Sequence, residues 1–271
     1  MDNSSAKKLA PILYFPHGGG PMPLLGDEGH QTIVAFWKDV SEKLPKPKAI
    51  VVISAHWVED VATITGSPSP ALIYDYFGFP EEAYQITYPA PGEPKLAAKL
   101  LKLLGAHRVK AQVDNQRGFD HGLFVPLKIM YPEANIPCIQ LSLLNSLDAG
   151  SHIRLGKALS RLRKEEELLI IGSGFSFHNL QAFFADDADQ PDAKNSEFEG
   201  WLVETCTNAS FSEADREKRL TDWENAPFAR YCHPREEHLL PLHVCYGIAQ
   251  SPAKLVFSDH IMGKRASAYL W

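Results

Sequence analysis

The sequence predicts an α/β fold, a single domain in which a central mixed or mostly parallel sheet is flanked by helices. Short β-branched runs alternate with longer amphipathic runs, which is the order expected of strands and helices packed in layers. The 271 residues are enough to bury a substantial core. No repeat, low-complexity tract or long Pro/Gly linker divides them. We therefore expect one domain over residues 1–271.

The strand candidates are short apolar runs, several of them rich in Val and Ile. They cover residues 11–15, 49–54, 62–65, 109–113, 137–141, 168–171 and 255–257. The helix candidates are longer, and they cover residues 31–43, 93–104, 123–130, 148–163, 195–208 and about 236–248. In the second of these, Leu96, Leu100 and Leu103 recur at steps of four and three residues, which predicts one buried stripe.

The composition excludes several classes of protein. With a net charge of -6 and no Lys/Arg cluster, the chain lacks the basic face that nucleic-acid binding needs. Its apolar runs are strand-sized, so we expect neither a membrane span nor a signal peptide. The four cysteines form no CxxC pair, which argues against a zinc ribbon or a disulfide framework. The cysteine pattern fits a reducing, cytoplasmic setting best. The composition is compatible with a monomer or a small homo-oligomer.

Histidines are placed where a sheet would bring them together. His17 follows ILYFP, His56 follows IVVISA, His178 lies beyond LLIIGSGFSF, and His238 opens the predicted helix HLLPLHVCYG. In open α/β sheets, ligands bind beyond the carboxyl ends of the strands, so these side chains can converge there. Three or more imidazoles at one point are typical of a metal site. Any one of them taken alone would more readily be an ordinary hydrogen-bonded histidine.

The loop HGGGPMP, which starts at His17, admits two interpretations. A glycine-rich turn between strand and helix can cradle phosphate. Here, however, the phosphate-binding patterns GxGxxG and GxxxxGK(S/T) are both missing, and Pro21 and Pro23 have no N–H to donate to an anion. The glycines more plausibly let the backbone pass close beside a ligand at His17, although an ordinary turn would look the same.

Two further histidine segments leave alternatives open. Asp120 could cap the helix that follows it, with His121 exposed; alternatively, His121 could donate a hydrogen bond to a bound anion or dioxygen. In HPREEHLLPLH, His238 and His243 are about 140° apart on a helix and cannot both face one metal. We choose His238 and expect His243 in the core. Glu237 should be turned about 100° away from His238.

Taken in order along the chain, these motifs resemble the class III extradiol ring-cleavage dioxygenases, in particular the 4,5-DOPA extradiol dioxygenase-like branch. The motifs are PHGGGP, SAHW, FGFP, YPAPG, DHGLFVPLKIMYP, GSGFSFHNL and HPREEHLLPLHV, and they span nearly the whole chain. In the broader superfamily that these motifs resemble, the iron site consists of two histidines and one carboxylate. In this sequence His238 stands where that carboxylate would be.

The resemblance implies one mononuclear divalent metal held by His17, His56 and His238, with Fe(II) in the active enzyme. It also implies that His178 is the catalytic acid/base and that His121 is a second catalytic histidine. The substrates would be a small catechol and O2. An all-histidine ligand set equally suits Zn(II). Trp57, Phe119 and Phe124 are candidate walls of the substrate pocket, and each could instead be a packing aromatic.

Two other functions are compatible with the same residues. A zinc hydrolase would use metal-bound water in place of dioxygen. A non-enzymatic binding module, similar to the Memo-type proteins, would not require the full histidine set. If the catechol is DOPA-like, its carboxylate needs a cation, and Arg117, Arg235 or Lys128 could serve.

Overall fold

The computed structural model describes residues 9–165, 167–185 and 191–271. Within these residues, one mixed sheet of eight strands has the order β4-β3-β5-β2-β6-β1-β8-β7. The strands are β1 (Ile12–Pro16), β2 (Ala49–Glu59), β3 (Ala62–Thr65), β4 (Ala111–Asp114), β5 (Cys138–Leu144), β6 (Leu168–Gly174), β7 (Lys254–Ile261) and β8 (Lys264–Leu270). The predicted α/β fold with a mixed central sheet is confirmed.

The middle of the sheet is parallel. Strand β2 pairs in parallel with β5 and β6, and β6 pairs in parallel with β1. On the outer sides β8 runs antiparallel to β1, and β3 runs antiparallel to β5. Because the four central strands point the same way, the segments that follow β1, β2 and β6 emerge at one edge of the sheet.

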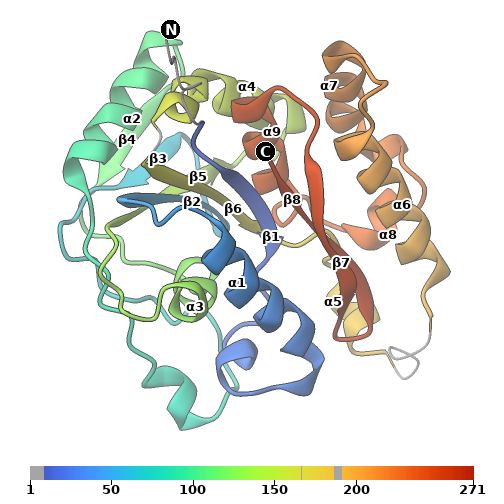
Figure 1. Ribbon diagram of the computed structural model, residues 1–271, viewed down its shortest axis with the longest axis horizontal. Helices are drawn as coiled ribbons and strands as arrows, with labels where there is room; N and C mark the ends of the chain where they lie inside the picture. The colour runs from blue at the N-terminus through green and yellow to red at the C-terminus, as the bar shows by residue number, and fades with distance from the viewer. Residues whose placement is uncertain (1–8, 166, 186–190) are drawn as a thin grey trace, which may run out of the picture.

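Helices cover both faces of this sheet (Figure 1). They are α1 (Gln31–Lys43), α2 (Pro94–Ala106), α3 (His121–Met130), α4 (Ala149–Ala158), α5 (Leu180–Phe183), α6 (Ala193–Thr207), α7 (Glu213–Thr221), α8 (Ala229–Cys232) and α9 (Leu240–Ala249). Two neighbouring residues of β6, Gly172 and Ser173, face opposite sides of the sheet. A Cβ on Gly172 would meet Cys245 and Pro241 of α9, whereas Ser173 donates a hydrogen bond to Gly122 O of α3. Helices α3 and α9 therefore pack on opposite faces of β6.

Two of the central strands, β1 and β6, are buried from end to end. Every residue of β1 and β6 is buried, as expected of parallel strands that are covered on both faces. The four cysteines are free and buried. Among the described residues, no helix is both long enough and apolar enough to cross a membrane.

Several elements differ from the sequence predictions, and helices α5, α7 and α8 were not predicted at all. Strand β8, with the sequence KRASAYL, was not predicted, because its charged and small residues give no alternating apolar pattern. The helix predicted over 148–163 ends at Ala158 and continues only as a 3-10 segment. The helix predicted from about residue 236 begins at Leu240, so His238 precedes the helix instead of opening it.

Candidate active site

Five histidines meet at the carboxyl edge of the central strands. They are His17 after β1, His56 within β2, His121 at the start of α3, His178 after β6 and His238 before α9. The Nε2 atoms of His17 and His56 lie 3.0 Å apart. The ring of His238 is centred 5.1 Å from that of His17 and 4.9 Å from that of His56. The convergence that the sequence suggested is thus present, and His121 belongs to it.

His17 is held by the glycine loop that follows it. Its Nδ1 lies 2.9 Å from Gly18 O, and its backbone N–H donates to Gly174 O at 3.0 Å. Gly18 has φ +83, a left-handed conformation that favours glycine. The N–H of Gly19 donates to Nε2 of His30 at 2.8 Å. Since this N–H is already bonded, it is not available to a phosphate. This supports the prediction that the loop does not bind phosphate.

His56 lies in an irregular stretch of β2. The pairing of β2 with β5 shifts register between Ile53 and Val58, and its pairing with β6 ends at Ser54. Such irregularities re-aim a side chain next to a functional site. The backbone N–H of His56 donates to Ser54 Oγ at 3.2 Å, and Ser54 donates in turn to Asp120 at 2.8 Å. The strand therefore supports His56 rigidly while turning it toward the other imidazoles.

His121 is buried and held by Asp75. Asp75 Oδ1 accepts hydrogen bonds from Nδ1 of His121 at 2.9 Å and from its backbone N–H at 3.0 Å. The alternative in which His121 is exposed is therefore wrong, since only 4% of its surface is accessible. Asp120 occupies the N-cap position of α3, but its side chain bonds Ser54, Gln140 and Arg117 instead of the helix.

His178 and His238 form the other side of the cluster. Their rings stack with centroids 3.3 Å apart and an angle of 10° between planes. Gly174 makes this possible, because a Cβ there would lie 2.2 Å from His238 O. Glu237 Oε1 lies 3.2 Å from Nδ1 of His238 and 3.8 Å from Nδ1 of His178. The expectation that Glu237 turns away is wrong, since it assumed a helix that begins only at Leu240.

The donor atoms fit a divalent metal. Two nitrogens bound at about 2.1 Å to one ion and roughly 90° apart lie about 3.0 Å from each other, which is the separation of the His17 and His56 Nε2 atoms. Nε2 of His238 is buried without a hydrogen-bond partner among the described residues. The potential ligand atoms of His17, His56 and His121 lie within 4.8 Å of one another, as do those of His178, Glu237 and His238. By these distances His121 completes a three-histidine group with His17 and His56, whereas His238 groups with His178 and Glu237.

Burial keeps these imidazoles neutral. It lowers the pKa of His17, His56 and His238 well below the usual histidine range, and the neighbouring imidazoles lower it further. Burial, and then the charge of His121, lowers the pKa of His178 to about 4. Neutral imidazoles offer a free lone pair, which is the form that binds a metal or accepts a proton.

The rings nearest the cluster are Tyr76 and Phe175. Tyr76 is centred 5.8 Å from His121, and Phe175 lies 6.3 Å from His17. Phe124 packs behind Tyr76 at 6.4 Å. Phe119 is fully buried, and Trp57 is covered by the Arg117 guanidinium at 4.5 Å. A pocket-wall role for Trp57, Phe119 and Phe124 stays a prediction.

The three candidate carboxylate partners already have contacts within the chain. Arg117 pairs with Asp120 at 3.2 Å, and Lys128 donates to Thr87 O at 2.8 Å. Arg235, which is 61% exposed, lies 3.3 Å from Glu237. Two of the three therefore lie near the histidine cluster, since Arg117 also donates to His56 O at 3.4 Å and Arg235 reaches Glu237.

Sequence reasoning missed the carboxylate of Asp75 and misjudged Glu237. Asp75 lies in an irregular segment, YDYFGFP, where no periodicity predicts the direction of a side chain. A signal for Glu237 was present, because Pro241 is favoured in the first turn of a helix and so marks a later helix start. His243 lies in the core as expected, with Nε2 2.9 Å from Leu220 O.

Comparisons with known proteins identify the family of this chain. Residues 13–266 match the family model described as the catalytic LigB subunit of aromatic ring-opening dioxygenase. The dioxygenase TasH of Hapsidospora irregularis is 39% identical, over 99% of this chain and 87% of its own length. The 4,5-DOPA dioxygenase extradiol of Beta vulgaris is 38% identical, over 94% of this chain and 93% of its own.

A solved structure shares the fold. The crystal structure of an uncharacterized protein of Escherichia coli K12 has a TM-score of 0.78 and 29% identity, and it covers 96% of this chain and 99% of that one. The family match and the identities to relatives, each over most of the chain, lead to the same conclusion. The chain belongs to the LigB family of aromatic ring-opening dioxygenases.

Proposed function

We propose that this protein is a metal-dependent extradiol dioxygenase that opens the ring of a small catechol with O2. The observation that supports this most is the convergence of five histidines, with the Nε2 atoms of His17 and His56 3.0 Å apart. The substrate is a catechol of the DOPA type, by analogy with the relatives named as 4,5-DOPA dioxygenases. The enzyme acts in the cytoplasm as a monomer or small homo-oligomer, without a nucleic-acid or membrane partner.

We assign the metal to His17, His56 and His238. The unpartnered, buried Nε2 of His238 favours it as the third ligand, because a buried nitrogen without a partner is costly unless something binds it. Nε2 of His121 is not one of the buried, unpartnered nitrogens among the described residues, so it gives no comparable reason to bind an ion. These residues would hold a divalent metal, Fe(II) in the active enzyme, which would supply a binding point for the catechol and the activation of dioxygen. Zn(II) would bind to the same three histidines and give an inactive form of the enzyme.

The remaining histidines handle protons and charge. His178 is the base that removes a catechol hydroxyl proton, and it is neutral near pH 7 because its pKa is lowered to about 4. Its Nδ1 faces Glu237 at 3.8 Å, so Nε2 is the atom left to accept the proton. His121 donates a hydrogen bond that stabilises negative charge developing on the substrate or dioxygen. Tyr76 and Phe175 exclude water from the adjoining space.

The test is reconstitution. The metal-free protein is loaded anaerobically with Fe(II), mixed with catechol, 3,4-dihydroxybenzoate or L-DOPA, and exposed to air. We expect oxygen uptake and a yellow product whose mass equals that of the substrate plus two oxygen atoms. The Zn(II)-loaded protein is the matched control and should consume no oxygen. Absence of uptake with every catechol, together with ester or amide hydrolysis by the Zn(II) form, would refute the oxygenase and favour the hydrolase.

A further inference from the structure

Two carboxylates divide the histidine cluster into two pairs. Asp75 Oδ1 lies 2.9 Å from Nδ1 of His121, and Oδ2 lies 3.6 Å from Nδ1 of His56. Glu237 Oε1 lies 3.2 Å from Nδ1 of His238 and 3.8 Å from Nδ1 of His178. Each carboxylate thus adjoins one histidine proposed as a metal ligand and one proposed as a catalytic residue.

We propose that Asp75 and Glu237 are positioning residues that fix which ring nitrogen of His121 and His238, the two histidines within hydrogen-bond distance of them, carries the proton. The proposal rests on the proposed function for the roles of the histidines, but its structural part does not. A carboxylate accepts from Nδ1–H, so Nε2 remains the nitrogen with a free lone pair. Carboxylate–histidine pairs of this kind orient the ring and raise its basicity toward a metal.

The surroundings of Asp75 favour its anionic form. His121 is the first residue of α3, and its backbone N–H donates to Asp75 at 3.0 Å, so the carboxylate sits at the positive end of a ten-residue helix. Asp75 also remains partly accessible, with 21% of its side chain exposed. Within the described part of the chain, the ion pairs of Asp75 are with histidines and not with a lysine or arginine, so the helix end and His121 stabilise its negative charge.

The distances predict that the two carboxylates act on different steps. Asp75 is closer to His121 than to His56, so its loss should impair the catalytic histidine more than the ligand. Glu237 is closer to His238 than to His178, so its loss should weaken metal binding first. Loss of an outer-sphere partner typically costs about 10- to 100-fold in activity or metal affinity.

The experiment compares Asp75→Asn and Glu237→Gln, which keep the shape of each side chain and remove its charge. For Asp75→Asn we expect kcat to fall about 10- to 100-fold, with KM and Fe(II) affinity within about threefold of the wild type. For Glu237→Gln we expect Fe(II) or Zn(II) affinity to fall about 10- to 100-fold. Asp39→Asn and Glu236→Gln are matched controls, since these carboxylates pair with Lys43 and Arg230 and not with the cluster.

A second readout does not depend on turnover. Long-range ¹H–¹⁵N spectra of the Zn(II)-loaded protein report which nitrogen of each histidine is protonated. The wild type should show His121 protonated at Nδ1, and Asp75→Asn should shift it toward Nε2. Unchanged tautomers and unchanged kcat in Asp75→Asn, beside a wild type that opens catechols, would overturn the proposal. A wild type that opens no catechol contradicts the proposed function instead, and the tautomer and metal-affinity measurements still decide the role of the carboxylates.

Discussion

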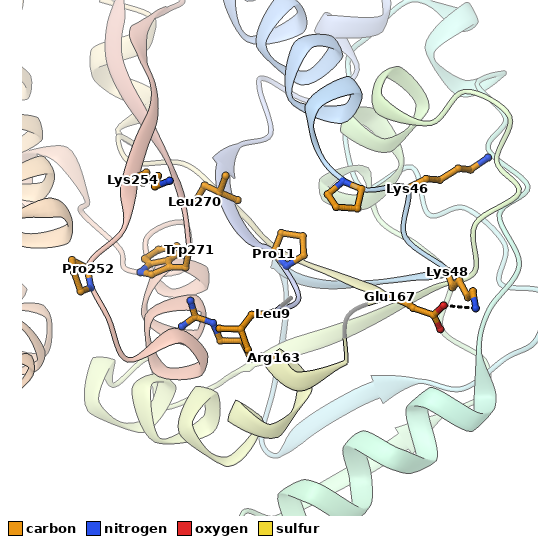
Figure 2. A pocket seen from close by; sticks show the side chains of 11 residues that line it. Leu9, Pro11, Lys46, Lys48, Arg163, Glu167, Pro252, Lys254, Leu270 and Trp271 are labelled. Atoms are coloured by element: carbon orange, nitrogen blue, oxygen red, sulfur yellow. Dashed lines mark ion pairs between the residues drawn. The ribbon is translucent and has the colours of Figure 1, made fainter. Parts of the chain in front are cut away.

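The two ends of the central strands carry different chemistry. At the carboxyl ends, five histidines and two carboxylates crowd around one point. At the amino ends lies a cavity of about 720 Å³, lined by Pro11, Lys48, Arg163, Glu167 and Trp271 among others (Figure 2). None of the described residues that line it is a histidine. The convergence of titratable side chains, and not open volume, is therefore the feature that singles out the candidate active site.

The polar groups of the amino-end cavity mainly hold the chain together. Arg163 Nη1 donates to Ala249 O at 2.6 Å and to Ser251 Oγ at 3.2 Å. Trp271 Nε1 donates to Ser251 O at 2.9 Å, and Lys48 pairs with Glu167 across the strand starts (Figure 2). We therefore expect substitutions at the carboxyl end to change metal binding and turnover, and substitutions at the amino end to change stability alone.

The largest effect is expected from the proposed ligands. His17→Ala or His238→Ala should reduce Fe(II) affinity by more than the roughly 100-fold typical of an outer-sphere partner, because a direct bond is lost. Oxygen uptake should become undetectable, while the metal-free proteins keep their melting temperature within a few degrees. Metal analysis and calorimetry check this. His260→Ala, at a side chain that is 63% exposed, is the control and should leave both quantities unchanged.

His178→Ala separates the base from the ligands. The protein should retain its metal, and kcat should fall about 10²- to 10⁴-fold, because proton transfer to a positioned base contributes that much. Single-turnover kinetics beside metal analysis measure the two effects. A His178→Ala protein without metal would show that His178 is a ligand and that one of the proposed ligands is the base.

The parallel half of the fold could be predicted because its strands carry their own signal. The starts of β2 and β6 are continuous apolar runs, which are typical of buried parallel strands. Strand β8 escaped because its burial depends on its neighbours β1 and β7, and not on its own pattern. Lys264 at its start is only 4% exposed, since it reaches Asp192 at 3.2 Å. Tertiary contacts of this kind leave no local trace.

For the active site, the sequence revealed which residues converge but not how they are held. The positions of His17, His56, His178 and His238 relative to the predicted strands indicated that these side chains converge. Asp75 was missed because it reaches His121 from 46 positions away in the chain, through a segment without regular structure. Pairings of that kind are decided by the packing of whole elements and become visible only in the folded protein.

At the amino end, Arg163→Met should lower stability without affecting turnover. The substitution keeps the aliphatic stem and removes the hydrogen bonds to Ala249 O and Ser251 Oγ. Hydrogen bonds to a charged group contribute about 1.5–3 kcal/mol, so we expect the free energy of unfolding to fall by about that amount. Urea denaturation measures the free energy of unfolding, and oxygen uptake measures turnover. A tenfold change in kcat with unchanged metal content would mean that the two ends of the sheet are coupled.

The smallest effect is expected from the pair between Lys48 and Glu167. Both side chains are largely exposed, at 75% and 61%, so water and salt screen their attraction. Glu167→Gln should lower the free energy of unfolding by less than about 1 kcal/mol, and this difference should disappear at high salt. The backbone bond from Lys48 N to Glu167 O, 2.7 Å long, remains in the variant and keeps the strand starts in register. A larger, salt-independent loss would indicate that the Glu167 side chain stabilises the amino end through packing and not through charge.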